Sequence, residues 1–119
     1  MVTECKLKVK GSKDSMGSTA LHYAAEKGHD LMIYFLGDMG LNVNERDALG
    51  NTPLHIACGA NNHNSVKFLL SMGAEVEAKN SNGQTPLFSA VQAANLRSTK
   101  ELLLRGADRS AKADDGTTL

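Results

Sequence analysis

The stretch TPLHIA, residues 52–57, lies in the middle of the chain and decides how the rest is interpreted. A threonine can cap the N-terminus of a helix, and a proline is tolerated in the first turn because its missing N–H would have no partner there. Related stretches occur at equal distances on either side, as TALHYA at 19–24 and TPLFSA at 85–90. His55 therefore belongs to a repeating unit, and its role has to be explained together with that unit.

These stretches define a 33-residue period that extends well beyond them. Two series of glycines keep it, namely Gly17, Gly50, Gly83 and Gly116, and Gly40, Gly73 and Gly106. Each unit predicts a turn, a short helix of small residues, a more apolar second helix and an extended return; in the second unit the helices should span about 53–60 and 64–71. Helices this short are not stable alone, so each unit must pack against its neighbours. The sequence predicts a short helical solenoid.

The period and the Thr-Pro-Leu-His-x-Ala signature resemble those of ankyrin repeats. The resemblance implies an all-α repeat solenoid, in which helix-turn-helix units are joined by β-hairpin-like loops. We expect repeats at 14–46, 47–79 and 80–112, with 1–13 as an N-terminal extension or the remnant of a preceding repeat and 113–119 as a partial fourth repeat. The resemblance further implies that His22 and His55 are scaffold residues whose rings link successive loops. The structural positions also include the helix-capping threonines Thr19, Thr52 and Thr85.

The composition excludes several classes of function. Thirteen basic residues balance thirteen acidic ones and aromatic residues make up 4% of the chain, so nucleic-acid binding is not expected as the main role. No apolar run is long enough for a membrane span. The two cysteines, Cys5 and Cys58, match no zinc spacing, and we expect a cytoplasmic protein, with the nucleus as the alternative. No nucleophile–base pair, phosphate loop or metal cluster is recognisable, so we expect no enzyme activity, metal or cofactor.

The ankyrin family mostly binds proteins through turn tips and first helices, which line a concave face. Carried over by position, the predicted protein-binding residues on this face are Ser15, Met16, Ser18, Lys27, Leu49, Asn51, Asn82, Gln84 and Gln92. Met16 and Leu49 are apolar residues at equivalent tips, and exposed apolar neighbours often mark contact sites. A basic column, with one member in each period, consists of Lys13, Arg46, Lys79 and Lys112. It favours a partner with an acidic, extended segment, although a solvated part of the scaffold is the alternative interpretation.

The role and the oligomeric state of the module have alternatives. The module could be a stand-alone inhibitor of a kinase or transcription factor, or the ankyrin segment of a larger enzyme or channel. We expect a monomer, with end-to-end stacking through the exposed terminal repeats as the alternative.

Asn44 resembles the asparagine that ankyrin repeats present to a protein hydroxylase, which makes it a candidate modification site.

Two irregularities give local expectations. The apolar run Leu102–Leu104 ends one residue later in its unit than Leu70 does, which predicts a longer or reshaped loop near 93–98. Gly37 replaces the last apolar residue of its helix. Because a glycine in a helix interior costs about 0.5–1 kcal/mol relative to alanine, we expect the first repeat to be the least stable.

Overall fold

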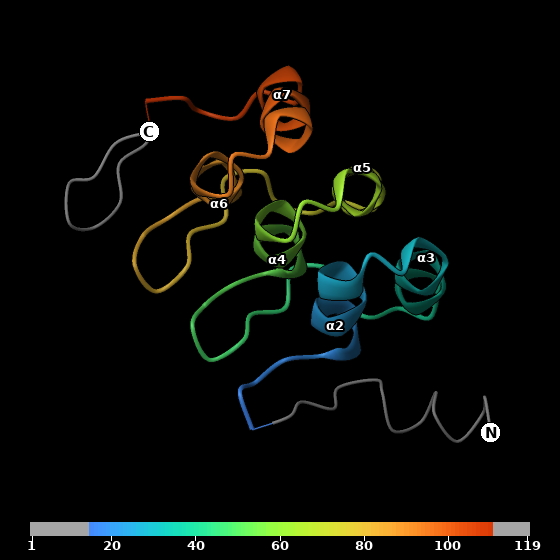
Figure 1. Ribbon diagram of the computed structural model, residues 1–119. Coiled ribbons are helices and arrows are strands. Elements are labelled where there is room, and N and C mark those ends of the chain that lie inside the picture. The colour runs from blue at the N-terminus through green and yellow to red at the C-terminus, as the bar shows by residue number, and fades with distance from the viewer. Residues whose placement is uncertain (1–14, 111–119) are drawn as a thin grey trace.

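The computed structural model describes residues 15–110, in which six short helices form three antiparallel pairs and no strand is present (Figure 1). The helices are α2 (Ala20–Lys27), α3 (Asp30–Asp38), α4 (Pro53–Gly59), α5 (His63–Ser71), α6 (Pro86–Gln92) and α7 (Leu96–Leu104). In Figure 1, α2, α4 and α6 form one layer and α3, α5 and α7 the other. Each helix packs on its partner in the pair and on its counterpart in the next pair. The predicted all-α repeat solenoid is confirmed.

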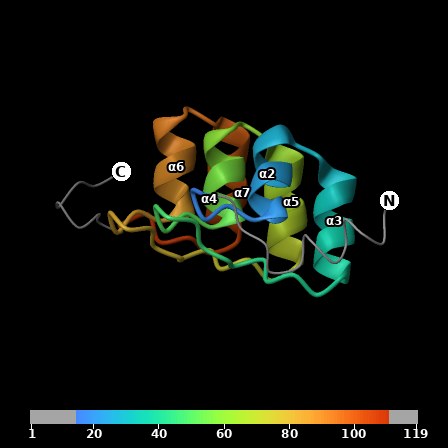
Figure 2. The same ribbon diagram turned by 90° about the horizontal axis from the view of Figure 1, so that it is seen from below.

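The two kinds of connection lie at opposite ends of the helices. Figure 2 shows the short links within each pair at one end and the longer loops between pairs at the other. The inter-pair loops are therefore brought together along one edge of the stack.

The first helix of the middle pair starts as its sequence predicts. Thr52 is extended (φ −87°, ψ 165°), its side chain accepts a hydrogen bond from the backbone N–H of His55, and Pro53 follows.

The core lies between the two layers and continues from pair to pair. Leu21 and Leu54 are completely buried and Leu87 is 1% exposed, one from each first helix. Small residues such as Ala57 let neighbouring first helices approach closely, while Ile33 and Val66 fill the space towards the outer layer. Because each pair contributes the same positions, the core is continuous along the stack and no pair could bury its apolar face alone.

The prediction of a longer loop near 93–98 is wrong. Only residues 93–95 separate α6 from α7, just as 60–62 separate α4 from α5, and the bounds of the third pair are those of the second carried forward by one repeat period. Leu104 occupies the position of Ser71 and is 74% exposed, whereas Leu102 occupies the position of Leu69 and is fully buried. The third leucine extends the apolar run into solvent and does not displace the helix.

Gly37 has a packing role that the sequence does not reveal. A methyl group on its Cα would overlap the side chain of Met72, which reaches over α3 from the end of α5. The glycine therefore makes room for a side chain of the next repeat. The expected lower stability of the first repeat stays a prediction.

Some expectations concern residues beyond the described part. Lys13, Lys112 and the segments 1–13 and 113–119 lie outside residues 15–110, and the repeat boundaries stay predictions. Of the helices in the described part, none has the length and apolar character needed to cross a membrane.

Candidate protein-binding face

The turns before α4 and α6 are each fixed by a side chain at the start of the turn. Asp47 Oδ1 accepts hydrogen bonds from the backbone N–H groups of Leu49 and Asn51, both at 2.9 Å. Asn80 repeats this in the next turn, where its Oδ1 accepts from Asn82 and Gln84, both at 3.0 Å. Aspartate and asparagine favour such turns because their short side chains reach backbone N–H groups two residues on. The tips are thus held in one shape by local contacts.

Successive tips are also hydrogen-bonded to each other. Ala48 N donates to Met16 O at 2.8 Å, and Ser81 N donates to Leu49 O at 3.0 Å. The approach requires a glycine in the turn, since a Cβ on Gly50, which has φ +79°, would lie 2.6 Å from Ser81 N. The tips therefore form a continuous ledge along the stack, with Met16 (54% exposed) and Leu49 (58% exposed) in neighbouring positions.

His22 and His55 connect each first helix to the following turn. The Thr19 N–H donates to His22 Nδ1 at 3.0 Å, and His22 Nε2 lies 2.8 Å from the carbonyl of Asn51. His55 makes the same pair of contacts, with Thr52 N at 3.1 Å and the Gln84 carbonyl at 2.9 Å. Because Nδ1 accepts, Nε2 must carry the proton that it donates to the carbonyl. Each ring therefore joins one repeat to the next.

The environment of His55 keeps its ring neutral. Burial lowers the pKa of His55 below 6.5, although the Gln84 carbonyl raises it. A neutral ring with both nitrogens in hydrogen bonds has no lone pair available to take a proton from a substrate. The geometry is that of a structural histidine and does not support a catalytic base.

Phe88 interrupts this series in the third repeat. Its ring is 2% exposed, and the hydroxyl of Thr85, which would face a histidine, is buried with no hydrogen-bond partner. The predicted capping role of Thr85 is therefore wrong, because its side chain makes no hydrogen bond to the helix that it precedes.

The predicted face residues fall into two groups. Most are exposed: Ser15, Met16, Lys27, Leu49, Asn82 and Gln92, whereas Ser18 is half-buried. Asn51 and Gln84 are half-buried and belong to the turn scaffold, because the Asn80 amide donates to Asn51 Oδ1 at 3.1 Å and to Gln84 Oε1 at 3.4 Å. Only the exposed residues of the first group are open to a partner without a change in the turns.

Of the predicted basic column, Arg46 and Lys79 are described. The Arg46 guanidinium donates to the carbonyl of Gly50 at 3.1 Å and to that of Lys79, so it braces two successive loops. Lys79 is exposed. The arginine thus has a scaffold role besides its charge.

Asn44, the candidate modification site, joins two repeats. It is half-buried; its amide donates to Gly73 O at 3.3 Å and its Oδ1 accepts from Glu75 N at 2.8 Å. The side chain therefore has a structural role that the sequence reasoning missed, and its modification stays a prediction.

Two further asparagines link the repeats and were also missed. Asn62 donates to Ala25 O at 2.7 Å, and Asn95 donates to Cys58 O. Both occupy the same place in successive repeats, immediately before the second helix. That coincidence within the period is the signal that could have found them.

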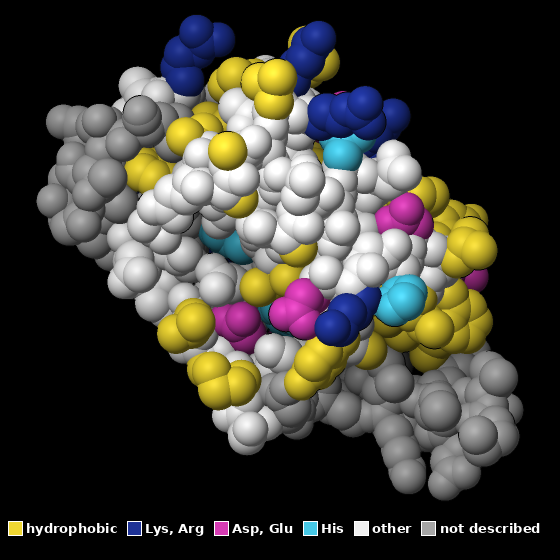
Figure 3. Space-filling view, in the orientation of Figure 1, with side chains coloured by type: hydrophobic (Ala, Val, Ile, Leu, Met, Phe, Trp, Pro, Cys, Tyr) yellow, Lys and Arg dark blue, Asp and Glu magenta, His cyan; other side chains and the backbone are white. Residues whose placement is uncertain are grey.

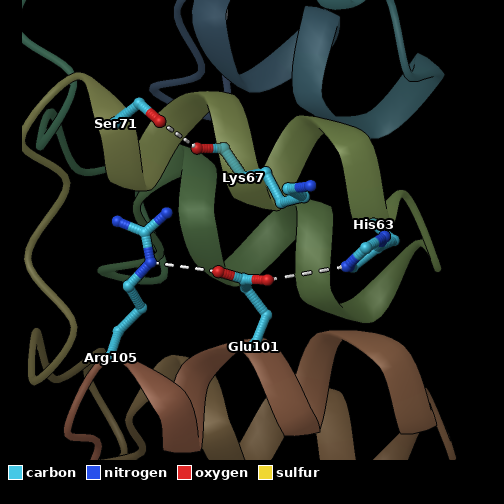
Figure 4. A network of polar contacts seen from close by, with 5 residues as sticks. All are labelled: His63, Lys67, Ser71, Glu101 and Arg105. Carbon is cyan, nitrogen blue, oxygen red and sulfur yellow. Dashed lines mark hydrogen bonds and ion pairs between the residues drawn. The ribbon is translucent and has the colours of Figure 1, made fainter.

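The outer layer has its own polar contacts. Figure 4 shows Glu101 of α7 between Arg105 and His63. Arg105 Nε lies 3.0 Å from Glu101 Oε2, and His63 Nε2 lies 3.8 Å from Glu101 Oε1. Nearby, the hydroxyl of Ser71 donates to the carbonyl of Lys67 at 2.9 Å. The contact between His63 and Glu101 lies between α5 and α7. Across residues 15–110, no group of three or more His, Cys, Asp or Glu side chains is placed to hold a metal ion.

The comparisons with known proteins agree with this geometry. The family model described as ankyrin repeats in three copies matches residues 38–113, and the model of a single ankyrin repeat matches residues 16–48. No curated protein matches the chain.

Proposed function

Because the chain belongs to the ankyrin repeat family, whose members generally mediate protein–protein interactions, we propose that it binds a protein partner on the face formed by its turn tips and first helices. The proposed module is non-catalytic and acts in the cytoplasm, with the nucleus as the alternative. The observation that supports it best is the ledge of hydrogen-bonded tips, which presents Met16 and Leu49 side by side on a fixed backbone. Because the backbone of the tips is already held in place, binding would require little ordering of the loops, which favours affinity.

The experiment is an affinity capture from cell lysate with the wild type beside Met16→Glu/Leu49→Glu. Its matched control is Leu31→Glu/Tyr34→Glu, which places two charges on exposed apolar residues of α3 instead (82% and 58% exposed). We expect a protein that the wild type and the control retain and the tip variant loses. If both variants lose it equally, or neither does, the tips are not the binding surface.

We further propose that the basic column attracts an acidic, extended segment of the partner. The exposed Lys79 and the charge of Arg46 at the loops support this, and such charges raise the association rate more than the final affinity. Arg46 also braces the loops, so the test should leave it in place.

The charge test compares Lys13→Glu/Lys79→Glu with Lys67→Glu/Lys100→Glu, which makes the same charge change on the outer helices. Slower association with the captured partner at low salt is expected for the first variant only. Equal rates for both variants would show that the column is solvated scaffold.

A further inference from the structure

Exposed apolar side chains lie at both ends of the described stack. The equivalent positions inside the stack hold residues that are buried or polar. At the first end, Met32 of α3 is 49% exposed, while Ser65 at the same position of α5 is fully buried by its neighbour. Phe35 is 42% exposed, one turn further along α3. At the other end, Leu96 of α7 is 80% exposed and replaces Asp30 and His63, the first residues of the other second helices. In Figure 3, hydrophobic side chains gather over α3 at the right-hand edge of the molecule.

The interior contacts define which positions face each other between repeats. Asp30, the first residue of α3, accepts a hydrogen bond from Ser65, the third residue of α5, at 2.6 Å. His63, the first residue of α5, lies 3.8 Å from Glu101, the sixth residue of α7. The first residue of α3 therefore faces the third residue of α5, and the first residue of α5 faces the sixth residue of α7.

Applied once more, this rule pairs the two ends. The first residue of α7 is Leu96, and the third and sixth residues of α3 are Met32 and Phe35. We propose that a second copy of this chain stacks its α3 on the α7 of the first, so that Leu96 packs between Met32 and Phe35 of the next copy. Leu96 and Met32 both stand where the interior repeats have polar residues, and they would face each other. This complementarity favours a second copy over an unrelated partner.

The inner layer agrees with the same register. Asn62 and Asn95 donate to the carbonyls of Ala25 and Cys58. Val91 is the residue equivalent to Ala25 and Cys58 in the third repeat, so its carbonyl would be the acceptor at the junction. His29 of the next copy is equivalent to Asn62 and Asn95, and its ring N–H can donate to that carbonyl. Val91 is 42% exposed although Ala25 and Cys58 are fully buried, as expected for a surface that a following repeat would cover.

The proposed contact joins two different surfaces, so it does not close on itself. Such a heterologous contact continues from copy to copy unless one end is blocked. By register, the turn at residues 15–18 of the second copy would lie at the junction, beside the tip of the third repeat of the first copy. The contact does not use Leu49, which lies at the tip of the second repeat, so a variant at that residue separates it from the proposed partner-binding face.

The test measures mass by sedimentation velocity over a concentration series from about 10 µM to about 1 mM, the range in which small interfaces associate weakly. Leu96→Glu blocks one end, and Met32→Glu/Phe35→Glu blocks the other; both sites are exposed. The control is Leu31→Glu/Tyr34→Glu, whose residues occupy the outward positions of Asn64 and Lys67. Circular dichroism melting of each variant confirms that it is folded.

We expect the wild type and the control to gain mass beyond a dimer with concentration, and each blocked variant to associate at least about tenfold more weakly. A 1:1 mixture of the two blocked variants should form dimers and stop there, because each retains the end that the other needs. A wild type that remains monomeric at about 1 mM would overturn the proposal. So would a mixture that stays monomeric, or a control as strongly impaired as the blocked variants. The single variant Leu49→Glu, which changes a tip residue away from the junction, should associate like the wild type, and this separates the result from that of the partner capture.

Discussion

The second and third repeats have the same helices, but the second has a histidine, His55, where the third has Phe88. α4 and α6 both begin at the proline that follows a threonine and have the same length, and their leucines Leu54 and Leu87 are equally buried. In the second repeat, His55 satisfies Thr52 and reaches the Gln84 carbonyl; in the third, Phe88 leaves the Thr85 hydroxyl without a partner. The helix therefore does not need the histidine in order to form. The histidine adds a connection to the next repeat.

The largest effect should come from the feature that the two repeats share. Leu54→Ala and Leu87→Ala each remove a fully buried side chain, so each should lower the free energy of unfolding by about 2–5 kcal/mol. Urea denaturation followed by circular dichroism measures both. An unchanged midpoint for either variant would contradict the assignment of that leucine to the core.

The next largest effect should come from making the second repeat resemble the third. His55→Phe removes the link to Gln84 and leaves the Thr52 hydroxyl and N–H without their acceptor, so we expect a loss of about 1–3 kcal/mol in stability. Equilibrium denaturation at about pH 7.5 measures it, with Phe88→Tyr as a control for changes in ring polarity. A loss of only about 0.3 kcal/mol or less would show that the histidine link is not a significant contact.

A smaller effect should appear when pH is lowered. Because the pKa of His55 is lowered in the folded protein, the unfolded chain takes up a proton first as pH falls below about 6.5. The stability that His55 contributes is therefore complete above that pH and decreases from there towards the lowered pKa of the folded state. The stability difference between wild type and His55→Phe should shrink from about pH 7.5 to about pH 5.5. A difference that is constant or grows would contradict a neutral buried ring.

The smallest effect should come from the threonines. Thr85→Val removes a hydroxyl that has no partner, so the free energy of unfolding should stay within about 0.5 kcal/mol or rise. Thr52→Val removes a helix cap that accepts from His55 N and should cost about 1 kcal/mol. If thermal melting gives equal losses for both, the two threonines have equivalent surroundings and the comparison fails.

The repeat period determines most of what could be predicted. A 33-residue spacing carries the positions of Thr52, Leu54 and Gly73 from one unit to the next, so the helices and turns follow from sequence alone. The prediction of a longer loop near 93–98 fails because it aligns the run Leu102–Leu104 by apolar character, whereas Gly106 and Pro86 keep the register. An exposed leucine is common on protein surfaces and is a weaker marker than a turn glycine.

Contacts between repeats are harder to predict than positions within them. In the sequence Gly37 looks like a weak point because its partner, Met72, belongs to the next repeat and a side-chain overlap has no local signal. The contact of Asn51 with Asn80 and that of Arg46 with the Lys79 carbonyl are hidden for the same reason, because each joins two successive loops.

The burial of Cys58 makes it a natural reporter of how often the repeats separate. Its side chain is fully buried, its carbonyl accepts from Asn95 of the next repeat, and burial raises the pKa of the thiol to about 12. Very little thiolate exists at neutral pH, so a thiol reagent can modify Cys58 only after the packing around α4 opens. The modification rate at Cys58, measured in a variant in which Cys5 is replaced by serine, would then time the opening of the middle of the stack.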